Sequence, residues 1–109
     1  MEKIMSKIND KLYRIFTEAK NVEWLKDLAV ANFGGCTFID AGGVWLGGKE
    51  QTIIIETVNQ DERQVKKFVR EICRYNDQES VLIQIIPCIY EFVSLPETKK
   101  EGGDNLYGL

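Results

Sequence analysis

Residues 34–58 read GGCTFIDAGGVWLGGKEQTIIIETV, and this stretch decides how the rest of the chain is arranged. Glycine pairs at 34–35, 42–43 and 47–48 divide an apolar stretch into short segments, and the segment 52–58 has the strongest strand character. Glycine adopts positive φ at little steric cost, so glycine pairs between apolar segments favour tight turns. We therefore predict a β-meander or hairpin with turns at Gly42-Gly43 and Gly47-Gly48.

Composition places the chain among ordinary globular proteins. Its 109 residues suffice for one domain, and 44% of them are hydrophobic. The net charge of -3 argues against a protein that holds duplex DNA by bulk electrostatics, because such proteins usually carry a positive excess. No segment has the length and apolarity of a membrane span, and the amino terminus lacks the apolar core of a signal peptide. We expect a cytoplasmic protein that binds neither a membrane nor duplex DNA.

Two residue types limit the chemistry. Histidine is absent, so this chain alone cannot form a Ser-His-Asp or Cys-His catalytic site. Cys36, Cys73 and Cys88 lie far apart in apolar segments, which is typical of reduced core thiols rather than zinc ligands. Asp40 and Glu50 are the one carboxylate pair considered for acid–base work or a cation, and no third group converges on them. We therefore predict a protein that is not an enzyme and needs no cofactor or metal.

The first part of the chain has strand and helix patterns in turn. Residues 1–11 have a weak helical period and indicate a short helix or a loose arm, whereas residues 12–17 favour a strand. Residues 21–32 indicate an amphipathic helix with Asn21 as its cap. Gly34 follows as the expected left-handed stop of this helix.

The second part of the chain repeats the pattern. Asp61 begins a helix that ends near Asn76, with a capping-box spacing to Gln64. Residues 80–87 alternate like a strand, and residues 89–95 form another extended run. The order predicts a ferredoxin-like βαββαβ fold of the α+β class: an antiparallel sheet with two helices on one face and an extra C-terminal strand.

The predicted sheet has a second apolar face. In segment 52–58, Ile53 and Ile55 share one face while Ile54 and Glu56 share the other. Two helices cover one face, and a second apolar face usually has a partner. We expect a homo-oligomer, either a dimer or a trimer. The domain should span residues 1–96, followed by a flexible tail at 97–109.

Polar and aromatic residues near the glycine-rich stretch and on the second helix favour an anionic ligand. Four basic side chains of the second predicted helix follow one another at spacings of four, three and four residues: Arg63, Lys67, Arg70 and Arg74. They could neutralise phosphates, or they could form an ordinary solvated helix face. Trp45 could stack a base or cover the core edge, and Gln78 and Glu79 could contact a base or cap backbone groups. The candidate ligand-binding residues are Trp45, Lys49, Glu50, Arg63, Lys67, Arg70, Arg74, Gln78 and Glu79.

A sequence pattern adds a resemblance. The segment 37–47, TFIDAGGVWLG, and the later segment 78–82, QESVL, resemble small bacterial and phage proteins of unknown function that share T-x-x-D-A-x-G-x-W-x-G and Q-E-S-V-L. The matching positions are Thr37, Asp40, Ala41, Gly43, Trp45, Gly47, Gln78, Glu79, Ser80, Val81 and Leu82. The group has no assigned chemistry.

More distantly, the order of hairpin, strand and helix is similar to the trimeric PII and CutA-like ferredoxin folds, which bind small molecules or metals between subunits. Neither the nucleotide-binding loop of PII nor the histidine of CutA is present. In general character the chain resembles phage anti-Thoeris and anti-CBASS sponge proteins. This implies a non-enzymatic protein that sequesters a cyclic nucleotide signal in the host cytoplasm. The alternative is a protein-interaction module, such as an inhibitor that docks on a host enzyme through the open sheet face or through Leu106 and Tyr107.

Overall fold

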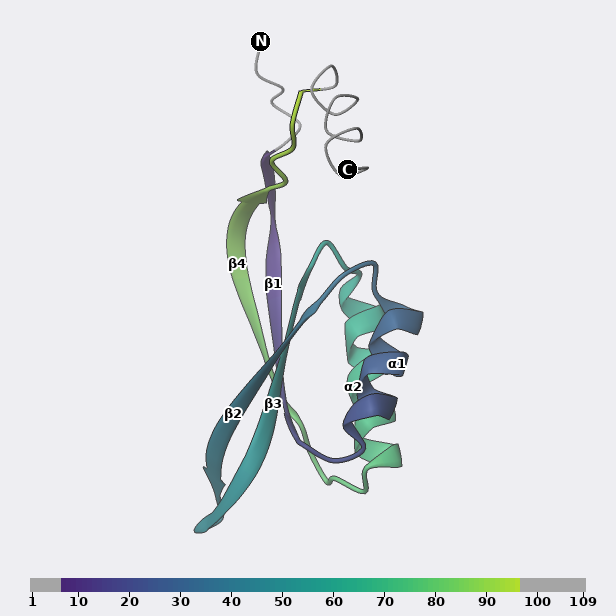
Figure 1. Cartoon of the computed structure of the whole chain (residues 1–109), viewed down its shortest axis with the longest axis vertical. Helices are drawn as coiled ribbons and strands as arrows, with labels where there is room; N and C mark the ends of the chain where they lie inside the picture. The colour runs from purple at the N-terminus through teal and green to yellow at the C-terminus, as the bar shows by residue number, and fades with distance from the viewer. Residues whose placement is uncertain (1–6, 97–109) are drawn as a thin grey trace, which may run out of the picture. The chain divides into compact units, whose positions relative to one another are not determined.

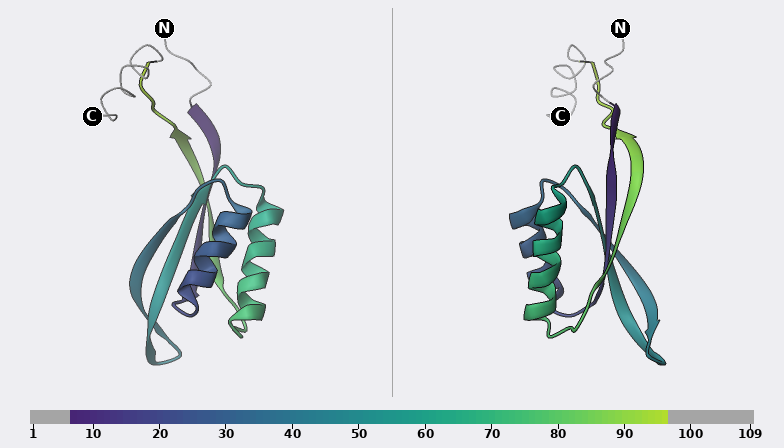
Figure 2. Two further views of the ribbon diagram at one scale, coloured as in Figure 1. Left: turned by 45° about the vertical axis from the view of Figure 1, so that its right-hand side comes forward. Right: turned by 180° about the vertical axis from the view of Figure 1, so that it is seen from behind.

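The computed structural model describes residues 7–96, with the side chains of residues 7–9 and 45 left out of the description. The elements follow in the order β1 (Lys7–Glu18), α1 (Val22–Asn32), β2 (Thr37–Trp45), β3 (Gly48–Val58), α2 (Glu62–Tyr75) and β4 (Leu82–Glu91) (Figure 1). The strands form a four-stranded antiparallel sheet in the order β2-β3-β1-β4. Both helices cover the same face of this sheet (Figure 2). The predicted ferredoxin-like α+β fold is confirmed.

By their contacts, the described residues divide into two units, residues 10–88 and residues 7–9 with 89–96. The first unit holds both helices and the hydrophobic core. In the second unit the rings of Tyr90 and Phe92 meet edge to face, with their centroids 5.6 Å apart.

The core lies between the helices and the covered face of the sheet. β1 and β3 pair so that Tyr13 lies opposite Thr57 and Ile15 opposite Ile55. Because side chains alternate along a strand, these four share the covered face, and none is more than 4% exposed. The helices contribute one apolar stripe each, as predicted, with Leu25 and Ala29 from α1 and Val65, Phe68, Val69 and Ile72 from α2.

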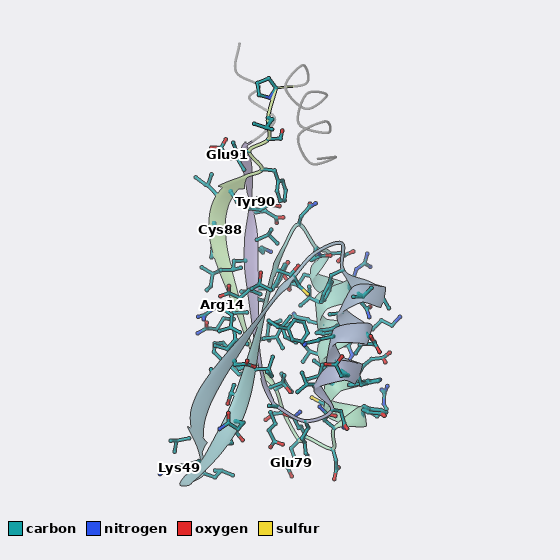
Figure 3. The ribbon with its side chains drawn as sticks, in the orientation of Figure 1. Arg14, Lys49, Glu79, Cys88, Tyr90 and Glu91 are labelled. Atoms are coloured by element: carbon teal, nitrogen blue, oxygen red, sulfur yellow. The ribbon has the colours of Figure 1, made fainter. Side chains whose placement is uncertain are left out.

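The opposite face of the sheet has no helix over it, as the alternation in β3 predicted. We call it the open face, and Arg14 marks it in Figure 3, on the side away from the helices. Its apolar residues outnumber its polar ones, although it lies outside the core. The open face includes Leu12, Arg14, Phe16 and Glu18 from β1, Thr37, Ile39 and Ala41 from β2, Thr52, Ile54, Glu56 and Val58 from β3, and Leu82, Gln84 and Ile86 from β4.

The β2–β3 hairpin differs from the predicted one. β2 runs without a break through Gly42 and Gly43, so the turn predicted there is wrong. The turn consists of Leu46 and Gly47, with φ of 50° and 80°, and Trp45 pairs with Gly48 across it. Positive φ at both central residues is typical of a type I′ turn, whose twist matches that of the flanking strands.

Helix α1 begins and ends without the caps that the sequence suggested. Asn21 precedes the helix with φ of 51°, and its side chain makes no capping hydrogen bond. At the other end Phe33 is extended and its backbone N–H donates to the carbonyl of Ala29. Gly34 is therefore not the left-handed stop, because the chain has already turned away from the helix at Phe33.

Helix α2 starts as predicted at Asp61, whose carboxylate accepts from the backbone N–H of Arg63 at 2.9 Å. The predicted capping box is not formed. Gln64 instead donates to the side-chain oxygen of Asn32 and so joins the two helices.

The two extended runs at the end of the fold form a single strand. β4 continues through Pro87 to Glu91, so the extra strand expected over 89–95 is wrong. Proline lacks a backbone donor and is confined mainly to edge strands, and β4 is an edge strand. The strand at the start also begins earlier than predicted, at Lys7. Residues 1–6 and 97–109 lie outside the described residues, so the arm, the tail and the boundary at residue 96 stay predictions.

Candidate functional site

The predicted ligand residues fall in two places. Trp45, Lys49 and Glu50 belong to the β2–β3 hairpin, and Gln78 and Glu79 belong to the α2–β4 turn. Hairpin and turn lie at the same end of the sheet, where Figure 3 labels Lys49 and Glu79. We call this the hairpin end. The basic side chains of α2 lie elsewhere, on the outer face of that helix.

The hairpin presents a cation and a carboxylate beside an apolar tip. Lys49 pairs with Val44 across the hairpin and is exposed, and Glu50 pairs with Gly43 and is half-buried. Val44 is 73% exposed and Leu46 is 92% exposed. The side chain of Trp45 lies outside the described part of the structure, so its role as a stacking platform stays a prediction.

The basic ridge of α2, formed by Arg63, Lys67, Arg70 and Arg74, is exposed along its whole length. Arg63 forms an ion pair with Asp61, Nη2 to Oδ2 at 3.7 Å, whereas the other three have no ion pair within residues 7–96. At 1.5 Å per residue the ridge is roughly 17 Å long. The hairpin bends to the other side of the sheet (Figure 2), so one small ligand cannot contact both the hairpin and the whole ridge of one chain.

The side chain of Gln78 is used within the fold. Its Nε2 donates to Thr17 Oγ1 at 2.9 Å, and its Oε1 accepts from the backbone N–H of Glu18 at 3.5 Å. These two contacts join the α2–β4 turn to the end of strand β1, and the predicted contact of Gln78 with a base stays a prediction. Glu79 is exposed next to it.

Asn76, a contact residue that the sequence did not single out, ties the α2–β4 turn to the loop between β1 and α1. Its side chain is 2% exposed, donates to the carbonyl of Lys20 at 3.1 Å and accepts from Asn21 Nδ2 at 2.8 Å. Lys20 Nζ returns a hydrogen bond to the Asn76 carbonyl at 2.8 Å. The signal available in the sequence was an asparagine at a helix end, which is too common to identify this contact.

An aromatic pair lies beside these loops. The rings of Trp24 on α1 and Tyr75 on α2 are stacked, with centroids 3.9 Å apart. Tyr75 is 58% exposed, so one face of the stack remains open to solvent. The sequence analysis did not identify this pair, because contacts between residues on different helices are not visible from spacing.

A second polar cluster missed by the sequence lies in the middle of the open face. Arg14 Nε donates to Glu56 Oε2 at 2.8 Å, and Arg14 Nη1 donates to Gln84 Oε1 at 3.2 Å. The guanidinium also lies 5.1 Å from the ring centroid of Phe16. This cluster joins three strands across the sheet.

Among the described residues, a few titratable groups have a pKa that departs from its ordinary value. Burial raises the pKa of the Cys36 thiol and of the Tyr13 phenol, which keeps both protonated at neutral pH. The hydrogen bond from Lys66, followed by that from Lys11, lowers the pKa of the Glu62 carboxyl. Within residues 7–96 no three cysteine or carboxylate side chains lie close enough to hold a metal ion.

Comparison with known proteins identifies the fold but no family. No protein-family model and no curated sequence matches the chain. Among solved structures, CPII, a nitrogen regulatory PII-like protein from Thiomonas intermedia K12 bound to ADP, AMP and bicarbonate, superposes with a TM-score of 0.59. It is 18% identical, and the match covers 83% of this chain and 98% of CPII. The chain and CPII share a fold.

A phage SAM lyase in its apo state is similar to the same degree. Its TM-score is 0.58 at 17% identity, and the match covers 86% of this chain and 95% of the lyase. The expected distant similarity to PII-like proteins is thus confirmed for the fold.

No helix in the described part of the chain is long and apolar enough to cross a membrane.

Proposed function

We propose that this protein binds a small anionic ligand that contains adenosine and does not transform it. The observation that supports this proposal is the shared fold, because the CPII structure holds ADP and AMP and the phage lyase is named for SAM. All three compounds contain an adenosyl group, and AMP and ADP are anions.

The hairpin end is the proposed location. Lys49 is an exposed cation on a β-turn hairpin, without an ion pair to any described residue. An ammonium group can bind a phosphate or carboxylate, and Glu50 and Glu79 can accept hydrogen bonds from ribose hydroxyls. Trp45 would stack the base, as the sequence suggested.

Binding without turnover is part of the proposal. The chain has no histidine, and the Cys36 thiol is held protonated by burial, so neither supplies a ready base or nucleophile at neutral pH. A protein that acts by sequestration needs affinity only.

Within this class, the biological role that we propose is that of a phage sponge. Such a protein would sequester a cyclic nucleotide signal of the host's immune response. The fold shared with a phage protein that is named for an adenosine compound supports a phage setting.

The test is a thermal-shift and calorimetric screen of the full chain. The panel contains AMP, ADP, SAM, cyclic dinucleotides, cyclic trinucleotides and cyclic ADP-ribose isomers. A ligand at about 100 times its Kd stabilises the folded state by about 2.7 kcal/mol, which is easily measured. We expect at least one compound to raise the Tm, and mass spectrometry to recover it unchanged.

Three variants locate the site. Lys49→Ala and Trp45→Ala should each lose the Tm shift, whereas Arg63→Ala, at the far end of the basic ridge, should keep it. No binding of any adenosine compound would show that the proposal is wrong. Cleavage of SAM by the purified protein would instead assign a lyase activity.

A second candidate function is a protein-interaction module, and the exposed apolar tip of the hairpin favours it. Val44 and Leu46 are more than two-thirds exposed, and a turn residue of this kind is usually polar. If the ligand screen is negative, Val44→Ser with Leu46→Asn should abolish any stoichiometric complex with a host protein.

A further inference from the structure

The open face of the sheet has the composition of an interface. Leu82 is 54% exposed, Ile39 is 36% exposed and Ile86 is 36% exposed, although all three are large apolar residues. They lie on the edge strands β2 and β4, and the hydrogen-bonded pair of Arg14 and Glu56 lies on the central strands between them. An apolar patch with one cation and one anion at its centre is typical of a surface that a protein partner covers.

The open face is complementary to itself. β3 and β1 are the two central strands, and Arg14 lies directly opposite Glu56 in their register. Consider two sheets stacked with their open faces together, related by a two-fold axis that runs parallel to the strands and midway between β1 and β3. This axis places β1 of one copy over β3 of the other copy. It therefore sets Arg14 of one copy against Glu56 of the other, twice per dimer.

The rows next to this pair match in the same way. Phe16 lies opposite Ile54 in the register, so the axis sets the ring of one copy against the isoleucine of the other. The same operation exchanges β4 with β2. Leu82 is two residues from Gln84, which binds Arg14, and Ile39 lies beside Ile54. Leu82 of one copy therefore faces Ile39 of the other copy. Apolar residues meet apolar residues, and opposite charges meet.

We propose that a second copy of this chain covers the open face, as a two-fold dimer with its sheets stacked face to face. Stacked sheets lie about 10 Å apart, which lets the side chains of both faces interdigitate. In the dimer each guanidinium can contact the carboxylates of both copies, so the charges remain paired when water leaves. The helices and the hairpin end are not used, so this proposal is independent of the ligand.

The mass of the full-length protein is the first test. Light scattering after size exclusion should give twice the 12.5 kDa of one chain at micromolar concentration. A monomer over the whole accessible concentration range would overturn the proposal, and a trimer would overturn the two-fold arrangement.

Charge reversal tests which face is used. The Arg14→Glu variant sets two carboxylates against each other across the axis, and the Glu56→Arg variant sets two guanidinium groups against each other. Each variant alone should therefore be monomeric. A mixture of the two should form a one-to-one heterodimer, because every contact across the axis is then between opposite charges.

This mixture distinguishes the interface from a pair within one chain. Each variant has like charges side by side on its own sheet, so a gain of assembly on mixing can come only from contacts between copies. Circular dichroism of each variant establishes that it is folded. If either unfolds, Leu82→Glu at an exposed edge position replaces it and should also give a monomer.

The matched control is Val30→Glu. Val30 is 80% exposed and lies on α1, on the other side of the sheet. This variant should remain a dimer. A dimer that resists both charge reversals, or two variants that stay separate when mixed, would show that the open face is not the interface.

Discussion

Gly43 lies against the side chain of Thr52 on the neighbouring strand. A Cβ atom built at Gly43 would be 2.7 Å from Thr52 Oγ1, whereas one built at Gly42 would have no atom within 4 Å. The two adjacent glycines of this strand therefore differ in their steric surroundings. Only Gly43 is required by close packing.

We predict that Gly43→Ala destabilises the protein and that Gly42→Ala does not. Overpacking of this kind costs about 1–3 kcal/mol, while alanine at an open strand position restricts the unfolded chain and is neutral or slightly stabilising. The free energy of unfolding in urea measures both. Thr52→Ala combined with Gly43→Ala should recover much of the loss, and equal effects of the two single variants would contradict the steric argument.

These glycines show where reading the sequence succeeds and where it fails. The alternation of Ile53 to Val58 predicted both faces of β3, because a strand repeats every two residues wherever it is placed. The glycine pairs predicted one turn, at Gly42 and Gly43, that the structure does not contain. A turn and a close approach between strands both require glycine, and only the position of Thr52 in space distinguishes them.

The sequence predicted the fold better than it predicted the arrangement of the candidate site. Lys49 and Glu79 lie at the same end of the sheet because the topology brings their loops there. Arg14 and Gln84 are 70 residues apart and meet only because β1 and β4 are neighbours. A contact set by strand order gives no local pattern, so the cluster on the open face could not be found from spacing.

The buried side chain of Asn76 leads to a second prediction. Asn76→Ala should lower the free energy of unfolding by about 1–3 kcal/mol, because the Lys20 carbonyl and the Asn21 amide lose a partner in a site with little water. Asn76→Asp keeps the size but loses the donor, so it should also destabilise. Thermal unfolding measures this, and Gln51→Ala at an exposed side chain is the control. An unchanged Tm in Asn76→Ala would contradict the role of these contacts.

The hairpin turn gives a prediction of the opposite sign. Leu46 has a φ of 50°, a conformation that asparagine adopts far more readily than leucine. Leu46→Asn creates the Asn-Gly pair that type I′ turns prefer and should stabilise the protein by about 0.5–1 kcal/mol. Leu46→Ala removes the same exposed apolar group without favouring positive φ, so it should give no such gain. Calorimetry of the three proteins compares them, and a lower Tm for Leu46→Asn would refute the turn assignment.

The pH dependence of stability has a defined sign at Glu62. Lys66 Nζ and Lys11 Nζ lie 3.0 Å and 3.2 Å from its carboxylate oxygens, and their hydrogen bonds lower its pKa below the ordinary 4.5. A carboxyl whose pKa is lower in the folded state stabilises the fold above its ordinary pKa, and this contribution is lost as the pH falls through the folded-state value. NMR titration of the Glu62 carboxyl should show its pKa rise in Lys66→Ala and stay constant in Lys26→Ala, which removes the separate pair with Glu23. Because the group is solvent-exposed, 1 M salt should weaken the shift in the parent protein. A Glu62 pKa that is the same in the parent and in Lys66→Ala would show that this contact does not stabilise the carboxylate.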